Sequence, residues 1–510
     1  APEAARVAAT AADRMRGALA GVTGVVVLDG AGAWRRRWPL RSAPGTVVRG
    51  GVQPLPGGRW RAWASVAAEE SATLLHRTEV EAPAADSALA LLADRVSAVV
   101  ATRVDMDVQW GRTLRRPRVY AAMERYLAAF EAVRAGDADA GIERFLDAWR
   151  TDSGFVFAGI MAAGNALAAD RFALGDSLLA ALAPYEAAML PLELHQYRRA
   201  RALARSDVQA TLAEAREVAR LEPSAPFLLG QYAEGAYLAN RPREALRAFD
   251  ALASRLGADA LPPAQAMLRA AALHALGRHA EELRAIDAVL AAQPTEPHFA
   301  STRLAPLAAL GRGDTLRVLL AALATRDDGR DPARLFRGVA LELQAHGYPD
   351  DAARLLAQGV AWLRGRPLPA DAPLARRLSA AELLLDAGRD AEAAALLAPT
   401  APDTARTPTM PQRSALLDLR GVLAARAGRA AEARAIGDSL ARLAARGRNG
   451  VETYRRARIA AALGDAEAAV LLLDQALQEG FVTHRELHVD PAFRRLRRDP
   501  RFQRVTAPRG

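Results

Sequence analysis

Histidine and carboxylate side chains are the groups in this sequence best suited to metal chemistry. His484 and His488 lie four residues apart, with Glu486 between them and Asp490 after them. On a helix this spacing would place two imidazole ligands on one face. No further set of ligands is apparent elsewhere in the sequence, so the segment predicts a polar turn into a C-terminal cap. His274 and His279 flank Gly277, are not spaced for one helix face, and predict no metal site.

Other catalytic arrangements are missing from the sequence. The 510 residues include no cysteine, and all 68 basic residues are arginine. This composition excludes disulfides, thiolate metal sites, thiol nucleophiles and Schiff-base lysines. Neither G-x-S-x-G nor H-E-x-x-H occurs, and no glycine-rich phosphate loop follows a strand. We therefore expect no catalytic residue, no cofactor and no metal within this chain.

The arginine excess has two interpretations. The net charge is only +10, because acidic residues are interspersed among the arginines along most of the chain. This distribution favours a solvated surface, and the high arginine content favours a GC-rich coding bias. Binding to nucleic acid or an anionic surface is the alternative. Arginines gather at Trp34–Trp38, at Arg112–Arg118 and in the tail, and we expect no specific nucleic-acid partner. The basic tail is the best candidate in the sequence for contact with an acidic partner or a membrane surface. It contains Arg494, Arg495, Arg497, Arg498, Arg501 and Arg504.

Residues 1–105 predict a small α/β domain. Helical periodicity covers 4–19 and 86–103, and the run at 24–28 is a short apolar strand. Strands are also predicted at 46–52, 59–67 and 73–80, because apolar and polar residues alternate there. A Pro-Leu-Pro-Gly-Gly turn separates the first two of these three strands, which predicts a hairpin.

A repeat of about 34 to 41 residues replaces the strand pattern from residue 118 onward. Each repeat has a helix-breaking residue between two helical segments: Gly136, Asp170, Ser206, Asn240, Gly277, Gly311, Gly347, Gly388, Gly428 and Gly464. A period near 34 is typical of paired antiparallel helices that stack on their neighbours.

Residue sizes inside each repeat support this interpretation. Five positions after the turn stands a small or apolar residue, which lets two helices approach closely; Glu282 fits this rule poorly. Four positions further on stands a large apolar residue. The small positions are Gly141, Gly175, Thr211, Ala245, Ala352, Ala393, Ala433 and Ala469, and the large ones are Phe145, Leu179, Phe249, Ile286, Leu356, Leu397 and Leu473.

These repeats resemble ten degenerate tetratricopeptide repeats. The resemblance implies a mainly α fold, a tetratricopeptide-type α-solenoid of about ten helix pairs preceded by the small α/β domain. Pro223 and Pro294 end second helices where that pattern places proline. The aromatic signature of the first helix is mostly absent, and Pro-rich insertions at 364–375 and 399–412 lengthen two repeats.

Residues 47–83 carry a second resemblance, to the TolB-N/FlgO-like domain. Its matching residues are Gly50, Gly51, Gly58, Arg61 and Leu75, whereas the usual opening strand and most of the second helix are missing. In bacteria that domain commonly precedes tetratricopeptide repeats in transmembrane serine/threonine kinases, adenylate cyclases and winged-helix regulators. The ending DPAFRRLRRDPRF is similar to the ending of such repeat proteins, and each Asp-Pro predicts a helix start.

The predicted organisation has four parts. Residues 1–105 form the TolB-N/FlgO-like domain, 106–117 a basic linker, 118–480 the repeats, and 481–510 the cap and basic tail. The first residue is Ala1, so we expect the chain to be processed or excised from a longer one. Asp94 and Arg95 interrupt the best apolar run, 88–101, which predicts a soluble region. It would be extracytoplasmic in a membrane kinase and cytoplasmic otherwise.

Two functions fit these patterns. The first is a non-catalytic scaffold, the sensory or interaction region of a bacterial regulatory protein, that binds a protein or peptide in a concave groove. The alternative is part of a serine/threonine kinase or cyclase whose catalytic domain lies outside these residues. First helices line the groove of such repeats, and arginines there favour carboxylates. The candidate partner-binding residues are Tyr120, Arg125, Tyr197, Arg198, Arg201, Gln231 and Arg337.

Overall fold

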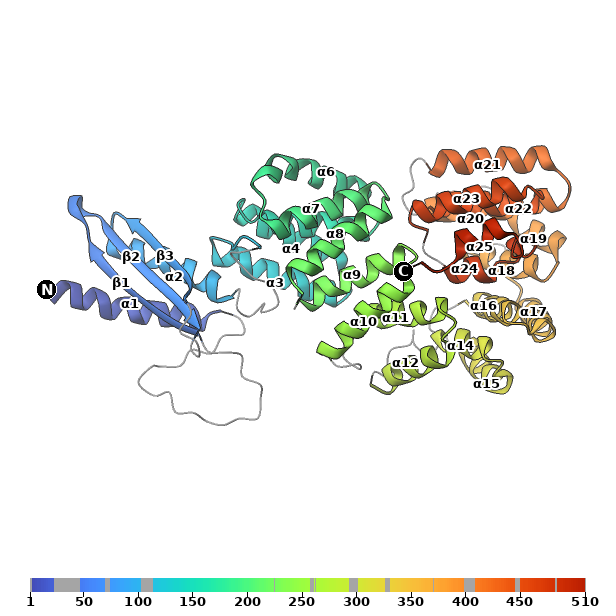
Figure 1. Ribbon diagram of the computed structural model, residues 1–510, viewed down its shortest axis with the longest axis horizontal. Helices are drawn as coiled ribbons and strands as arrows, with labels where there is room; N and C mark the ends of the chain where they lie inside the picture. Colours follow the sequence, from blue (N-terminus) through green and yellow to red (C-terminus); the bar gives the residue numbers. More distant parts are fainter. Residues whose placement is uncertain are drawn as a thin grey trace. The chain divides into compact units, whose positions relative to one another are not determined.

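The computed structural model describes residues 2–22, 46–68, 74–101, 113–223, 225–256, 261, 263–292, 301–325, 331–369, 371–398, 409–444, 450–481 and 484–509. These residues form two compact units (Figure 1). The N-terminal unit comprises 1–204 and 214–225, and the C-terminal unit comprises 205–213 and 226–510. The predicted strand at 24–28, the Trp34–Trp38 run and Arg112 lie outside the described residues.

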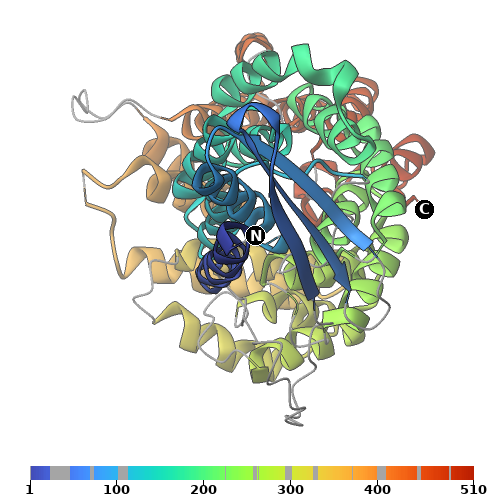
Figure 2. The ribbon, with the colours of Figure 1, turned by 90° about the vertical axis from the view of Figure 1, so that its left-hand side faces the viewer.

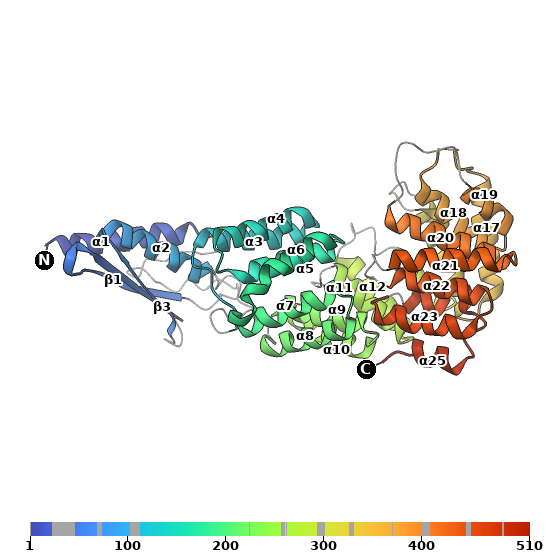
Figure 3. The ribbon, with the colours of Figure 1, turned by 90° about the horizontal axis from the view of Figure 1, so that it is seen from above.

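The N-terminal unit begins with a three-stranded antiparallel sheet of order β1-β2-β3. The predicted hairpin is confirmed, because β1 and β2 pair from Thr46–Ala68 to Pro54–Trp60. Two helices cover one face of the sheet, while the strands run side by side (Figures 2 and 3). The elements are α1 (Pro2–Ala20), β1 (Thr46–Pro54), the short 3₁₀ helix η1 (Pro56–Gly58), β2 (Trp60–Ala68), β3 (Leu74–Ala82) and α2 (Ala85–Ala101).

Alternation along β2 explains which face is covered. Ala62, Ala64 and Val66 are buried against α2. On the opposite face, Arg61 pairs with Glu79 and Glu81 of β3 at 2.9 and 2.7 Å. One apolar face therefore packs on helices while the other carries cross-strand charge pairs, as a half-buried sheet requires.

Antiparallel helix pairs make up most of the rest of the described chain. The first helices are α3 (Tyr120–Arg134), α5 (Val156–Ala168), α7 (Pro191–Ala204), α9 (Pro226–Leu238), α11 (Pro263–Ala275), α14 (Leu304–Ala309), α16 (Pro332–Ala345), α18 (Leu374–Asp386), α20 (Met410–Arg426) and α22 (Val451–Ala462). The second helices are α4 (Ala138–Thr151), α6 (Phe172–Leu182), α8 (Val208–Leu221), α10 (Pro242–Leu256), α12 (His279–Ala292), α15 (Gly313–Ala324), α17 (Pro349–Arg364), α19 (Asp390–Leu397), α21 (Ala430–Ala444) and α23 (Ala466–Gln478). A short 3₁₀ helix, η2 (Ala183–Ala188), precedes α7. No strand occurs among the described residues of 118–480, which confirms the mainly α prediction.

All ten predicted turn residues adopt positive φ. They include three residues other than glycine, Asp170, Ser206 and Asn240, at 59°, 57° and 56°. At Gly277 the following N–H, that of Arg278, donates to the carbonyl of Leu273 at 3.0 Å, and the same bond recurs at most of the other turns. This is the Schellman arrangement, which ends one helix and reverses the chain.

Close helix approach at the small positions is confirmed. A Cβ on Gly141 would lie 2.6 Å from Val133, and one on Gly175 would lie 2.6 Å from Leu167. Phe145 and Phe249, at the large positions, are fully buried. Many successive first helices also pack together, such as α5 with α7 and α20 with α22, so the apolar faces of neighbouring pairs close on one another. None of the described helices is both long and apolar enough to cross a membrane.

Phe249→Ala tests the repeat register. Because the ring is fully buried among neighbouring helices, its loss should lower the free energy of unfolding of the C-terminal unit by about 3–5 kcal/mol. Circular dichroism during denaturant unfolding measures this change. Arg247→Ala, on the exposed face of the same helix, is the control and should change it by less than about 0.5 kcal/mol. Equal effects of the two substitutions would contradict the register.

Candidate functional site

The C-terminal segment consists of α24 (His484–Val489), η4 (Pro491–Phe493) and α25 (Pro500–Thr506). It lies against the first helices α11, α16 and α22 of the C-terminal unit, and we call the surface that these helices form the first-helix face. Asp490 and Asp499 accept hydrogen bonds from backbone N–H groups at the starts of η4 and α25, which confirms the two predicted helix starts. α24 contacts the first helices α11 and α16, and η4 contacts the first helix α22, whereas α25 contacts the second helix α23.

Aromatic packing anchors this segment. Phe493 and Phe502 are buried, and the Phe493 ring centroid lies 5.8 Å from that of Tyr454. Tyr454 in turn stacks on Phe481, with centroids 4.1 Å apart. The segment therefore shares a hydrophobic core with the last helix pair.

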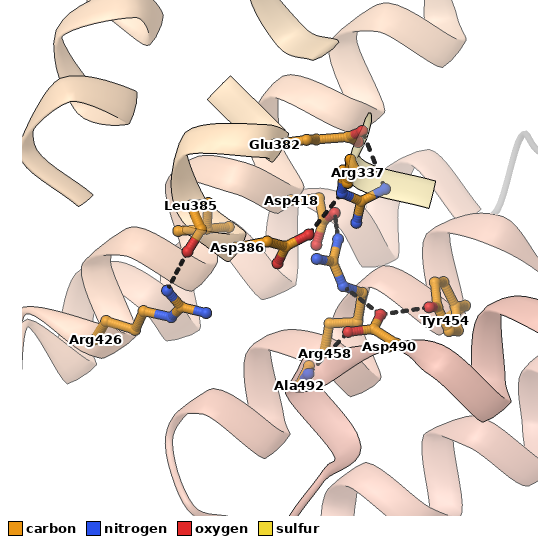
Figure 4. Close-up of polar contacts among 10 residues, drawn as sticks. All are labelled: Arg337, Glu382, Leu385, Asp386, Asp418, Arg426, Tyr454, Arg458, Asp490 and Ala492. Atoms are coloured by element: carbon orange, nitrogen blue, oxygen red, sulfur yellow. Dashed lines mark hydrogen bonds and ion pairs between the residues drawn. The ribbon is translucent and has the colours of Figure 1, made fainter. Parts of the chain in front are cut away.

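A buried arginine joins the segment to two first helices (Figure 4). Arg458 of α22 pairs with Asp418 of α20 and, at 2.9 Å, with Asp490. The Tyr454 hydroxyl donates to the same Asp490 carboxylate at 2.5 Å. Burial raises the pKa of Asp418 to about 6, although the positive charge of Arg458 acts in the opposite direction. The position of the cap therefore depends on charges held away from water.

A second arginine on this face is also paired. Arg337 of α16 donates to Asp386 at 2.6 Å and lies 3.4 Å from Glu382, both on α18 (Figure 4). Burial opposes the charge on Arg337, but these two carboxylates outweigh it and raise the pKa of the guanidinium. This predicted partner-binding residue is thus engaged with a neighbouring first helix.

Asn240, at the α9–α10 turn, holds the end of the segment. Its side-chain amide donates to the Ala507 carbonyl at 3.1 Å, and its own carbonyl accepts from the Arg509 N–H at 2.8 Å. The turn residue thus clamps three residues of extended backbone in addition to reversing its own helices.

Four of the eight histidines gather where α24 meets α11 and α16. His274 ends α11, His279 begins α12, His346 follows α16, and His488 belongs to α24. Ring centroids are 4.7 Å apart for His274 and His279, 4.7 Å for His279 and His346, and 5.3 Å for His346 and His488. The sequence predicted no metal site at these histidines, because His274 and His279 are not spaced for one helix face and no further ligand set accompanies His488. Packing of the helix pairs brings these histidines together from separate elements.

Two buried glutamates complete this histidine cluster. Glu342 of α16 lies between His274 and His346, with its Oε1 2.8 Å from Nε2 of His274 and 3.2 Å from Nε2 of His346. Glu282 of α12 lies 2.9 Å from Nδ1 of His274 and 3.3 Å from Nδ1 of His279. Both carboxylates are almost wholly shielded from water.

The cluster opens on a pocket of about 220 Å³. Residues of the first-helix face line one side, and the C-terminal segment supplies Leu487, His488, Arg497 and Phe502. Burial lowers the pKa of His274, but the hydrogen bond with Glu282 and the negative charges of Glu282 and Glu342 outweigh burial and raise this pKa to about 9. The arrangement therefore attracts positive charge, supplied by a proton or by a metal cation.

One sequence signal could have located this cluster. Glu282 occupies the small-residue position of its repeat, where close helix packing disfavours a charged side chain. Its carboxylate faces His274 and His279 instead of solvent. A buried glutamate that departs from a repeat pattern indicates a polar partner nearby.

Three of the other predicted partner-binding residues lie on α7. In the N-terminal unit, Tyr197 is buried and donates to the Leu179 carbonyl, and Arg201 lies over its ring at 5.5 Å. Arg198 and Arg201 both face Glu186, at 3.7 and 3.1 Å.

Two further candidates belong to α3, and one to α9. Arg125 is exposed and donates to the Ala121 carbonyl within α3. The Tyr120 hydroxyl donates to the Gly21 carbonyl at 3.3 Å. Gln231 is half-buried on α9 of the C-terminal unit.

Comparison with known proteins adds little to this picture. No known family model matches the sequence, and no curated protein matches it. Among solved structures, a chain in "Crystal structure of APC/C hetero-tetramer Cut9-Hcn1" is similar, with 11% identity, a TM-score of 0.24, and coverage of 75% of this chain and 86% of that chain. A TM-score this low carries no argument, so the fold assignment rests on the turns and packing of this chain.

Asp418→Ala tests the buried charges. Arg458 would remain in the interior with one carboxylate fewer, which should lower the free energy of unfolding by about 3–5 kcal/mol. Glu432→Ala removes an exposed partner of Arg429 and should cost less than about 1 kcal/mol. Thermal unfolding followed by circular dichroism compares them, and equal melting temperatures would show that the buried pair contributes no stability.

Asn240→Gly tests the clamp. Glycine keeps the positive φ but loses the side-chain amide that holds the Ala507 carbonyl, so amide exchange at Arg509, which this contact keeps against residue 240, should accelerate by up to about tenfold. Hydrogen-exchange mass spectrometry measures this rate. Asp170→Gly, at the corresponding turn of another repeat, is the matched control and should leave the tail unchanged.

Proposed function

We propose that this chain is a non-catalytic scaffold that binds protein segments on the first helices of its repeats. One observation carries the proposal: the first-helix face of the C-terminal unit already holds a non-repeat segment of polypeptide. It does so with Arg458 and Tyr454 on an acidic side chain and with Asn240 on the backbone. These are side-chain and main-chain contacts of the kind that a bound peptide would make.

The N-terminal unit offers the corresponding surface to a separate partner. Arg125 of α3 is exposed, and the side chains of Arg198 and Arg201 on α7 are 46% and 37% exposed. Glu186 accompanies both α7 arginines, so an incoming carboxylate would compete with an existing, solvent-accessible pair. We infer an acidic peptide as the partner, because guanidinium groups bind carboxylates with two parallel hydrogen bonds.

The resemblance of residues 47–83 supports a regulatory setting for this scaffold. The β1–β2 hairpin and β3 contain the residues matched to a TolB-N/FlgO-like domain, including Gly50, Gly51 and Arg61. In our proposal the chain is an interaction region of a bacterial regulatory protein. A kinase or cyclase domain outside these residues is compatible with it.

Selection of random peptides displayed on phage tests the partner class. Peptides enriched on the immobilised chain should be acidic, and titration calorimetry should show their affinity falling about tenfold or more in Arg125→Ala/Arg198→Ala/Arg201→Ala. The matched control is Arg150→Ala/Arg220→Ala, which removes exposed arginines from the second helices α4 and α8.

Three results would contradict the proposal. Enriched peptides without acidic residues would remove the partner class, and equal losses in the two variants would remove the site. Catalytic turnover by the 510-residue chain would overturn the non-catalytic assignment. Circular dichroism of each variant shows whether the fold is retained.

A further inference from the structure

We propose that His274, Glu342 and His346 bind a divalent transition-metal ion of the zinc class. These residues come from the end of α11 and from α16 with the residue after it, so the ion would tie two first helices together. Their ligand atoms all lie within 4.8 Å of one another. This site is independent of the peptide-binding function and belongs wholly to the C-terminal unit.

The distances among the three side chains suit one shared ion. Around a tetrahedral zinc with bonds of about 2.1 Å, neighbouring ligand atoms lie roughly 3.4 Å apart. Oε1 of Glu342 lies 2.8 Å from Nε2 of His274 and 3.2 Å from Nε2 of His346. Both of these distances would therefore lengthen, by about 0.6 Å at most, to admit the ion.

The two imidazole nitrogens that face Glu342 lack well-directed hydrogen bonds within the described part of the chain. Nε2 of His274 and Nε2 of His346 are both buried, yet neither makes a hydrogen bond of acceptable geometry with a described residue, despite the nearby carboxylate. A buried nitrogen left in this state is costly in a folded protein. Coordination of a cation would satisfy both nitrogens together.

Glu282 supplies the outer shell that such a site needs. Its Oε2 lies 2.9 Å from Nδ1 of His274, the nitrogen on the far side of the ring from the proposed ion. A carboxylate there accepts the Nδ1–H and leaves the Nε2 lone pair for metal. The Glu282 carboxylate also contacts His279, and this second contact fixes the orientation of the carboxylate.

The ligand types select the metal. Two imidazoles and one carboxylate suit zinc and its first-row neighbours, whereas magnesium and calcium prefer all-oxygen sets. The pocket that the cluster lines gives room for water as a fourth ligand. His488 and Arg497 reach this pocket from the C-terminal segment, so occupancy of the site should also affect how that segment packs.

A protonated His274 between two carboxylates is the competing arrangement, and it requires no ion. Equilibrium dialysis distinguishes the metal site from the protonated network. The untagged chain is stripped of metal with a chelator and then dialysed against Zn²⁺ or, as the control ion, Mg²⁺. Elemental analysis should find one zinc per chain and no magnesium. Cobalt substitution should give the visible absorption of a tetrahedral site, a readout that needs no variant.

Three variants assign the ligands. His346→Gln should abolish stoichiometric zinc binding, and Glu282→Gln should weaken it about 10–100-fold, as expected for an outer-shell residue. His195→Gln is the matched control. His195 also pairs with a glutamate, Glu214, at 2.7 Å, but both residues belong to the N-terminal unit. The His195→Gln variant should therefore bind zinc normally. Circular dichroism establishes that each variant is folded.

The proposal fails on either of two results. No zinc on the wild-type chain would leave the protonated His274 network as the correct description. Zinc retained by His346→Gln but lost by Glu282→Gln would place the ion with His279 instead.

Discussion

The fold depends on a left-handed residue between the two helices of every pair. At that residue the chain must reverse within a few bonds while the last carbonyls of the first helix still find donors. Glycine meets this requirement without a steric penalty, and Asp170, Ser206 and Asn240 meet it at small cost. Because the reversal recurs at near-constant spacing, each pair presents its apolar face at the same place, and stacking follows.

Buried charge gives the C-terminal unit a specificity that apolar packing alone does not. Arg458 can satisfy Asp418 and Asp490 together only when η4 lies in one position on α22. An apolar substitute would tolerate several positions of the cap. Buried ion pairs often add little net stability, so their effect here is better understood as selecting one arrangement of the C-terminal segment.

Departures from the repeat pattern coincide with the polar sites of the molecule. Glu282 replaces a small residue and faces the histidine cluster, and Asn240 replaces a glycine and clamps the tail. Glu282 is compensated within its own helix pair, by His274 and His279. Asn240 finds its partner in the C-terminal segment, 267 positions away along the chain.

The sequence by itself determined the elements and their order: the β1–β2 hairpin, the ten turns, the small and large packing positions such as Gly141 and Phe249, and the two Asp-Pro helix starts. These features are local, since propensity, capping and spacing act within about forty residues.

Only the tertiary structure decided which polar groups meet. Tyr197 became a core residue and Arg337 an ion-pair partner, because neighbouring helices cover them. His274, His346 and His488 come together because the helix pairs stack and the C-terminal segment returns to pack on them. Residues more than two hundred positions apart therefore share one surface, and no local sequence pattern encodes that relation.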